Sequence, residues 1–212
     1  IIRGYTEVGE QEYIDTGYTE GGASGLAAVW AENNTRESID DAFRRKETFA
    51  TTGSRIKVRF FGGYQIDEAF DKEDPVNFAY ANAVTMGGDI LQSENQTPQF
   101  LVWALRDVKR APLDRVQIIK GWTEMSGKPH EEIYDVVCSD GRKPSLKTNL
   151  CEESKASVNL DNCQISSNSG SNELKAVWED PNFNPDLKAF YYVRVLENPT
   201  CRWSTWDALK SG

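Results

Sequence analysis

The stretch Val29-Trp-Ala-Glu-Asn-Asn-Thr-Arg-Glu-Ser-Ile-Asp-Asp-Ala-Phe-Arg-Arg-Lys-Glu-Thr-Phe-Ala-Thr-Thr-Gly-Ser-Arg-Ile56 predicts one capped helix that leads through a turn into a strand. Asn34 and Glu37 have the spacing of a capping box, in which a short side chain accepts a bond from a free N–H and an acid three residues later reaches back. We therefore expect the helix to begin near Asn34 or Thr35.

The expected helix, residues 34–46, carries an apolar stripe. Ile39, Ala42 and Phe43 recur at helical spacing, so this stripe must pack on another part of the protein. Residues 55–60 then alternate polar and apolar side chains, as a half-buried strand does. The stretch thus predicts a docked helix followed by the first strand of a sheet.

The segments on either side of this stretch have weaker patterns. Residues 1–28 show no sustained periodicity, and we expect a loop or an extended arm there. Gly62-Gly63 predicts a break in the strand. Asp74-Pro75 combines a capping residue with a favoured first-turn proline, which predicts a short second helix over 76–84. Met86-Gly-Gly-Asp-Ile90 predicts a return to extended structure.

The second half of the chain has the pattern of an antiparallel β-sandwich. Runs rich in β-branched or aromatic residues are separated by Pro, Gly, Asn and Asp. The expected strands cover residues 100–105, 115–120, 132–138, 156–160, 174–178 and 190–196. We predict a mainly β fold with one or two helices, divided into an N-terminal arm, helix and strand over 1–56 and a β-sandwich domain over 57–212.

Composition excludes two classes of partner. The net charge is −9, and basic residues are scattered among acids, which argues against binding nucleic acid. No apolar run approaches the roughly 18 residues needed to cross a bilayer, so no membrane span is expected. The chain opens at Ile1 without an initiator Met, and we expect a mature or proteolysed segment of a longer precursor.

The four cysteines, Cys138, Cys151, Cys163 and Cys201, all lie toward the C-terminus. None belongs to a C-x-x-C pair and the chain has one histidine, so a zinc site is disfavoured. Two disulfides are expected instead, in any of three pairings, with four buried free thiols as the alternative. Disulfides indicate an oxidising compartment, either periplasmic or extracellular.

Few residues suggest chemistry. His130 follows Lys128-Pro129 in a polar turn, and the acidic residues between 67 and 74 lack the spacing of an EF-hand. Trp203 and Trp206 lie beyond the last expected strand and could form a binding surface, with His130 as a further candidate. No catalytic residue, metal ligand or cofactor is expected in this segment.

Several motifs together carry a family resemblance. They appear in one order as residues 31–39, 45–53, 59–63, 86–89, 113–121, 190–199 and 201–206. In these motifs the chain closely resembles the C-terminal part of a large bacterial family, domain of unknown function 3604.

The resemblance implies a longer, usually exported protein whose upstream half resembles a PHP-type (polymerase and histidinol phosphatase) metal-dependent hydrolase. A divalent metal is expected in that upstream domain, whose histidine motifs do not occur here. Residues 34–46 and 48–53 resemble the closing helix and final strand of the hydrolase barrel. The resemblance and chain order also favour the pairs Cys138–Cys151 and Cys163–Cys201.

We therefore expect an accessory, structural segment of an exported PHP-like metallohydrolase that hydrolyses a phosphate or other ester in its intact form. The expected partner is the upstream part of the same polypeptide, and the segment itself is not expected to be catalytic. The alternative is a secreted carbohydrate- or protein-binding β-sandwich module.

Overall fold

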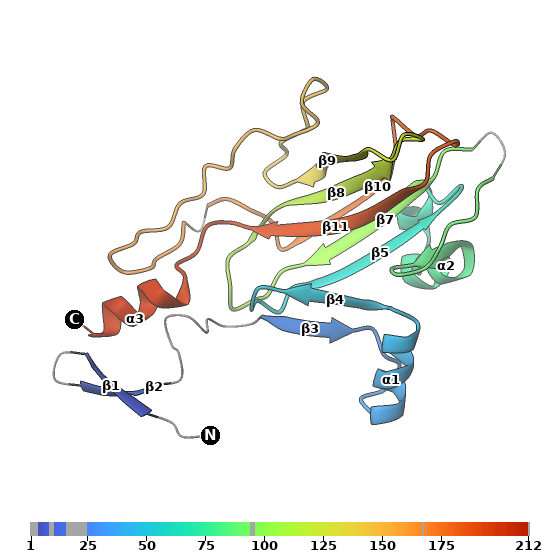
Figure 1. The fold of residues 1–212 in the computed structure, drawn as a ribbon. Helices are drawn as coiled ribbons and strands as arrows, with labels where there is room; N and C mark the ends of the chain where they lie inside the picture. The colour runs from blue at the N-terminus through green and yellow to red at the C-terminus, as the bar shows by residue number, and fades with distance from the viewer. Residues whose placement is uncertain (1–3, 9–10, 16–24, 94–95, 167, 212) are drawn as a thin grey trace.

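The computed structural model describes residues 4–8, 11–15, 25–93, 96–166 and 168–211 (Figure 1). It is mainly β, with α-helices and one short 3₁₀-helix at the periphery. In chain order the elements are β1 (Gly4–Val8), β2 (Gln11–Asp15), β3 (Leu26–Val29), α1 (Arg36–Arg44), β4 (Thr48–Thr51), β5 (Lys57–Gly63), η1 (Ala69–Asp71), α2 (Pro75–Asn82), β6 (Ala83–Thr85), β7 (Gln99–Leu105), β8 (Leu113–Thr123), β9 (Pro129–Cys138), β10 (Glu173–Glu179), β11 (Ala189–Glu197) and α3 (Trp203–Ser211).

Two antiparallel sheets form the body of the molecule. The first has the strand order β10-β7-β5-β6 and the second β11-β8-β9. Alternate residues of both sheets meet in one apolar core, to which β5 contributes Val58 and Phe60 and β8 contributes Val116 and Ile118. This face-to-face packing agrees with the predicted antiparallel sandwich.

Aromatic contacts join the two sheets. The rings of Phe100 on β7 and Tyr191 on β11 have centroids 4.2 Å apart, and those of Tyr134 on β9 and Trp178 on β10 are 4.8 Å apart. On the outer face of the first sheet, η1 and α2 cover a second apolar cluster that includes Phe61. The first sheet is therefore buried on both faces.

The β3–β4 ribbon is attached at the side of this sandwich. Phe49 of β4 packs against the main core, and Trp30 Nε1 donates to the Val58 carbonyl at 2.8 Å. The Arg59 guanidinium lies 3.7 Å from the centroid of the Trp30 ring, a cation–π contact. Within the described part of the chain, β3 and β4 pair only with each other and no closed barrel forms, so the expected relation to a hydrolase barrel stays a prediction.

Helix α1 differs in detail from the capping-box prediction. Its N-cap is Thr35, whose Oγ1 accepts from the Ser38 N–H at 3.2 Å, so Asn34 and Glu37 do not form the cap. The apolar stripe is narrower than expected. Ala42 is fully buried, but Phe43 is 52 % exposed, because the helix contacts its neighbours over a small area.

Four further expectations need correction. The segment 1–28 contains β1, β2 and β3, although residues 1–3, 9–10 and 16–24 of that prediction lie outside the described residues. Gly62 and Gly63 stay within β5, where added Cβ atoms would lie 2.6 Å from Ile90 Cδ1 and 3.2 Å from Ala83. Residues 86–90 form a turn and irregular chain, with the strand β6 before them. Residues 156–160 make one isolated bridge, Val158 to Ile165, and no strand.

The other expected elements are present. The strands predicted over 100–105, 115–120, 132–138, 174–178 and 190–196 correspond to β7, β8, β9, β10 and β11, and the helix predicted over 76–84 is α2. Asp74 caps α2 by accepting from the N–H groups of Val76 and Asn77. Among the described residues there is a third α-helix, α3, that the prediction of one or two helices omitted.

The cysteines pair as the resemblance implied. Cys138 bonds Cys151 and Cys163 bonds Cys201, which ties the long connection between β9 and β10 to β9 at one point and to the segment after β11 at another. Within the part of the chain that the structure describes, no helix is long and apolar enough to span a membrane.

Candidate functional site

A broad groove lies between β4 and β11, and we call it the β4–β11 groove. It has a volume of about 1630 Å³ and is open to solvent. Its floor consists of Ile56, which precedes β5, and of Val58, Phe60 and Gly62 on the inner face of β5, with Phe100 of β7 beside them. The floor therefore belongs to the apolar core, against which Tyr191, Val193 and Val195 of β11 also pack.

The walls of the groove are strand edges. β5 contributes every second residue, as a strand does when one face is presented. By contrast, β11 and the residues around it contribute an unbroken run from 185 to 200, and β4 with its next residue contributes 48–52. Among the strands that the structure describes, β11 is the last of its sheet and β4 pairs only with β3. Both strands thus present unpaired backbone edges to the groove.

A tight turn closes one end of the groove. Gly87 has φ +82°, and an added Cβ there would lie 2.4 Å from Lys46 Cβ and 2.6 Å from the Lys46 carbonyl oxygen. Only glycine accepts both this backbone conformation and this close approach without strain. The turn is therefore held against the residues that lead into β4.

A carboxylate lies at the opposite end. Glu197 lines the groove near Ser54, and its Oε1 is buried without a hydrogen-bond partner among the described residues. Burial raises the pKa of the Glu197 carboxyl, against the opposing effects of Ser54 and Arg110. A buried acceptor without a partner costs about 1–3 kcal/mol, so this end of the groove favours a ligand group that donates a hydrogen bond.

The wall next to Tyr191 holds a buried polar network. Lys120 Nζ lies 2.6 Å from Asp180 Oδ2 and also donates to the Asn182 carbonyl at 2.7 Å. Tyr191 donates to the same Asp180 oxygen at 2.6 Å, and burial together with this carboxylate raises the pKa of the Tyr191 hydroxyl. Each of these groups has its partners within the protein, so the network stabilises the wall and offers no free acid or base.

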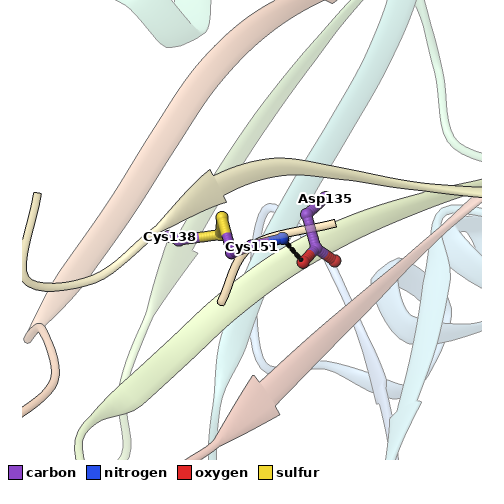
Figure 2. Close-up of side chains that lie close together, drawn as sticks. All are labelled: Asp135, Cys138 and Cys151. Carbon is purple, nitrogen blue, oxygen red and sulfur yellow. Dashed lines mark hydrogen bonds between the residues drawn. A yellow bond between two sulfur atoms is a disulfide. The ribbon is translucent and has the colours of Figure 1, made fainter. Parts of the chain in front are cut away.

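A second cluster has the residue types of a metal site but not the chemistry. Figure 2 shows Asp135 beside Cys138 and Cys151, whose ligand atoms all lie within 4.8 Å of one another. The two sulfurs are joined in a disulfide. Asp135 already accepts from the Cys151 N–H at 2.7 Å, from Gln117 at 2.6 Å and from Arg115 at 3.1 Å. This carboxylate therefore fixes the disulfide loop on β8 and β9.

The donor set does not fit the metal centre that the resemblance implies for the upstream domain. His130 is the single histidine of the chain, and its Nε2 lies 2.6 Å from Glu124 Oε1. Its ring stacks on Trp122, with centroids 5.2 Å apart. The nitrogen ligands of a multi-metal site cannot be assembled from one histidine held in this way.

The structure does not bring the predicted surface residues together. His130 pairs with Trp122 at one end of the second sheet, whereas Glu197 pairs with Leu113 at the other end. Trp203 and Trp206 lie on α3, which follows that second end, and are 40 % and 41 % exposed (Figure 1). These three residues form no single site.

Sequence reasoning missed both the groove and an aromatic pair on β11, whose residues alternate with those that pack on the core. Phe190 and Tyr192 are 61 % and 43 % exposed, and their rings are nearly parallel with centroids 6.3 Å apart. Phe190 lies across Gly121, where an added Cβ would be 2.2 Å from Phe190 Cζ. The alternation in residues 190–196 would have placed these two rings on one face.

Residues 4–212 match the model of a family described as "Protein of unknown function (DUF3604)". The chain belongs to this family. No curated protein and no solved structure shows a significant match to it. The DUF3604 match covers the β3–β4 ribbon, the sandwich and α3, so the elements around the β4–β11 groove all belong to the family domain.

Proposed function

We propose that this DUF3604 chain is a non-catalytic β-sandwich module that docks on the catalytic part of a larger, exported metal-dependent hydrolase and supports it. The observation that carries the proposal is the β4–β11 groove, an apolar surface bordered by two unpaired strand edges. Proteins rarely leave such edges open, because they pair with other chains. A docking partner would satisfy both the edges and the floor.

The β3–β4 ribbon also favours a docking role. It has two short strands, and a two-stranded sheet is marginal without further packing. Leu26 at the start of β3 is 44 % exposed, and β3 has no second neighbour among the described strands. This ribbon therefore fits a position between the sandwich and a further domain.

The catalytic chemistry is assigned to the partner. In the proposed intact protein a divalent metal activates water for attack on a phosphate or other ester. The buried Asp135, Asp180 and Lys120 are each paired within the fold, so they offer no free acid or base. Their proposed contribution is to hold the docking face in shape.

The two disulfides support an exported location. They close loops with sequence separations of 13 and 38 residues, and such bonds persist in oxidising compartments. We place the protein in the periplasm or outside the cell.

Hydrolysis by the purified chain tests this proposal. The chain is incubated with bis(p-nitrophenyl) phosphate and p-nitrophenyl acetate in the presence of Mn²⁺, Zn²⁺ or Mg²⁺. No metal-dependent turnover is expected. Turnover that co-elutes with the chain on gel filtration and disappears with a chelator would overturn the non-catalytic assignment.

A second candidate function, a secreted carbohydrate-binding module, is favoured by the Phe190–Tyr192 pair. Two exposed, nearly parallel rings on a sheet form a flat aromatic surface of the kind on which an apolar sugar face can stack. Binding to a panel of glycans tests this function. It is measured for Phe190→Ala and Tyr192→Ala, with Trp203→Ala and Trp206→Ala as the matched control variants. Binding lost only in the first pair would establish this surface, and absence of glycan binding would reject it.

A further inference from the structure

We infer that the β4–β11 groove receives one extended β-strand, which pairs with both edges and joins the β3–β4 ribbon to the second sheet. This inference rests on the docking role proposed above and names the form of the docked element. The strand is assigned to the upstream part of the same polypeptide. Its insertion gives a continuous outer layer of order β3-β4-strand-β11-β8-β9 opposite the first sheet.

Strand direction supports a single insertion. Figure 1 shows β4 and β11 pointing the same way, while β3 is antiparallel to β4 and β8 is antiparallel to β11. One strand that runs opposite to both β4 and β11 makes every pair in the completed layer antiparallel. Two inserted strands would force a parallel pair into a molecule whose described strand pairs are all antiparallel.

The size of the groove agrees with one strand. Strands are about 4.8 Å apart within a sheet, stacked sheets are about 10 Å apart, and a strand rises about 3.3 Å per residue, so each residue fills about 160 Å³. The groove volume of about 1630 Å³ therefore holds about ten residues. β11, the strand beside it, has 9 residues.

The groove also sets the side-chain pattern of the strand. The floor of Val58, Phe60 and Phe100 requires apolar side chains at alternate positions, and the outward positions are polar. Glu197 lies at the C-terminal end of β11, so the N-terminal end of an antiparallel strand meets it. An arginine or lysine at the first inward position would give the buried Glu197 Oε1 its missing donor.

A synthetic ten-residue peptide is the probe. It carries arginine at its first inward position, valine at the other inward positions and threonine at the outward positions, with two lysines added after its C-terminal end. Binding to the purified chain is measured by fluorescence anisotropy, and its location by hydrogen exchange. We expect saturable binding and slower exchange of the amides in β4 and β11. A peptide with N-methyl groups on alternate residues, which removes its edge hydrogen bonds, should bind at least tenfold more weakly.

Two variants on neighbouring residues of β11 locate the contact. Both residues lie along the groove edge, but the Val193 side chain packs on the apolar core whereas Tyr192 is 43 % exposed, so Val193→Asp should weaken peptide binding at least tenfold and Tyr192→Asp less than twofold. Glu197→Gln should weaken the arginine peptide about fivefold but leave a peptide with glutamine in place of arginine unchanged. Circular dichroism and urea unfolding confirm that each variant is folded.

Several results would overturn the inference. These are failure to bind the peptide at millimolar concentration, equal losses in Val193→Asp and Tyr192→Asp, or binding that leaves exchange in β4 and β11 unchanged. A concentration-dependent dimer that Val193→Asp dissociates would show that a second copy fills the groove instead. These failures are distinct from that of the proposed function, which fails on metal-dependent turnover by the chain alone.

Discussion

Lys120 Nζ lies 2.6 Å from Asp180 Oδ2, and both side chains are almost completely removed from solvent. The pair connects β8 to the segment after β10, and Tyr191 of β11 donates to the same carboxylate oxygen. An ion pair of this kind stabilises the fold only while both partners are present, because an isolated buried charge is costly. It therefore holds together the wall of the groove next to Tyr191.

Lys120→Met should reduce the free energy of unfolding by about 3–5 kcal/mol, since it leaves the Asp180 carboxylate buried without its cation. Urea unfolding followed by tryptophan fluorescence measures the loss. Adding Asp180→Asn should recover part of it, because the second change removes the uncompensated charge. If the costs of the two single changes were simply additive in the double variant, the pair would not be coupled and this view of the wall would be wrong.

Glu197→Gln should stabilise the chain increasingly as pH rises. The pKa of Glu197 is raised by burial in the folded protein, so the folded state binds this proton more tightly than the unfolded chain does. Wild-type stability is therefore lost as pH increases from the ordinary value of 4.5 through the raised pKa. The variant lacks this loss, and its advantage at pH 7 should be about 1 kcal/mol, the low end for a buried acceptor without a partner.

Urea unfolding of both proteins from pH 4 to pH 8 provides the measurement. Asp186→Asn, an exposed acid that also lines the groove, is the control and should show no such trend. A constant difference between Glu197→Gln and wild type across this range would contradict the assignment of Glu197 as a buried, unsatisfied carboxyl.

Gly87→Ala should destabilise the chain by about 3 kcal/mol and open the closed end of the groove. The substitution adds a clash with Lys46 to the cost of a left-handed backbone. Gly127→Ala is a matched control, because Gly127 has φ +87° but nothing within 4 Å of an added Cβ. The control should cost about 1 kcal/mol. Similar thermal unfolding midpoints for the two variants would show that the turn is not held against Lys46.

Removing the Cys163–Cys201 bond should cost more than removing Cys138–Cys151. The loop-closure estimate gives about 4 kcal/mol for a separation of 38 residues and about 3 kcal/mol for 13. Paired Cys→Ser variants of each bond, unfolded in urea, measure the difference. The reverse order would show that contacts around Asp135 outweigh loop closure.

Local patterns predicted much of the sandwich. Neighbouring residues alone predicted the alternation that places Val58 and Phe60 in the core. The capping residue Asp74 and the first-turn Pro75 likewise predicted the start of α2. The capping box predicted for α1 was wrong in its cap residue. Asn34 and Thr35 are both good capping residues, and Thr35 is the one that caps the helix. The isolated bridge at Val158 shows that a strand-like run forms no strand without a partner strand to pair with.

The groove could not be predicted, because it depends on contacts between distant segments. β4 and β11 are about 140 residues apart in the chain, and nothing in either sequence shows that its edge stays unpaired. Lys120 and Asp180 are far apart in the sequence, and only the fold brings them together as an ion pair. Gly62 and Gly63 suggested a break in the strand. The sequence does not show that Ile90 and Ala83 pack closely against them, which is why glycine occurs inside β5.

Amide hydrogen exchange along β11 in the purified chain tests the central claim most directly. In an antiparallel edge strand, alternate N–H groups bond to the single neighbour and the others point away from it. We predict alternating slow and fast exchange over residues 190–195 in an NMR experiment, with the fast amides directed into the groove. Uniform protection along these residues would show that the β11 edge is already paired or covered, and would contradict an open docking groove.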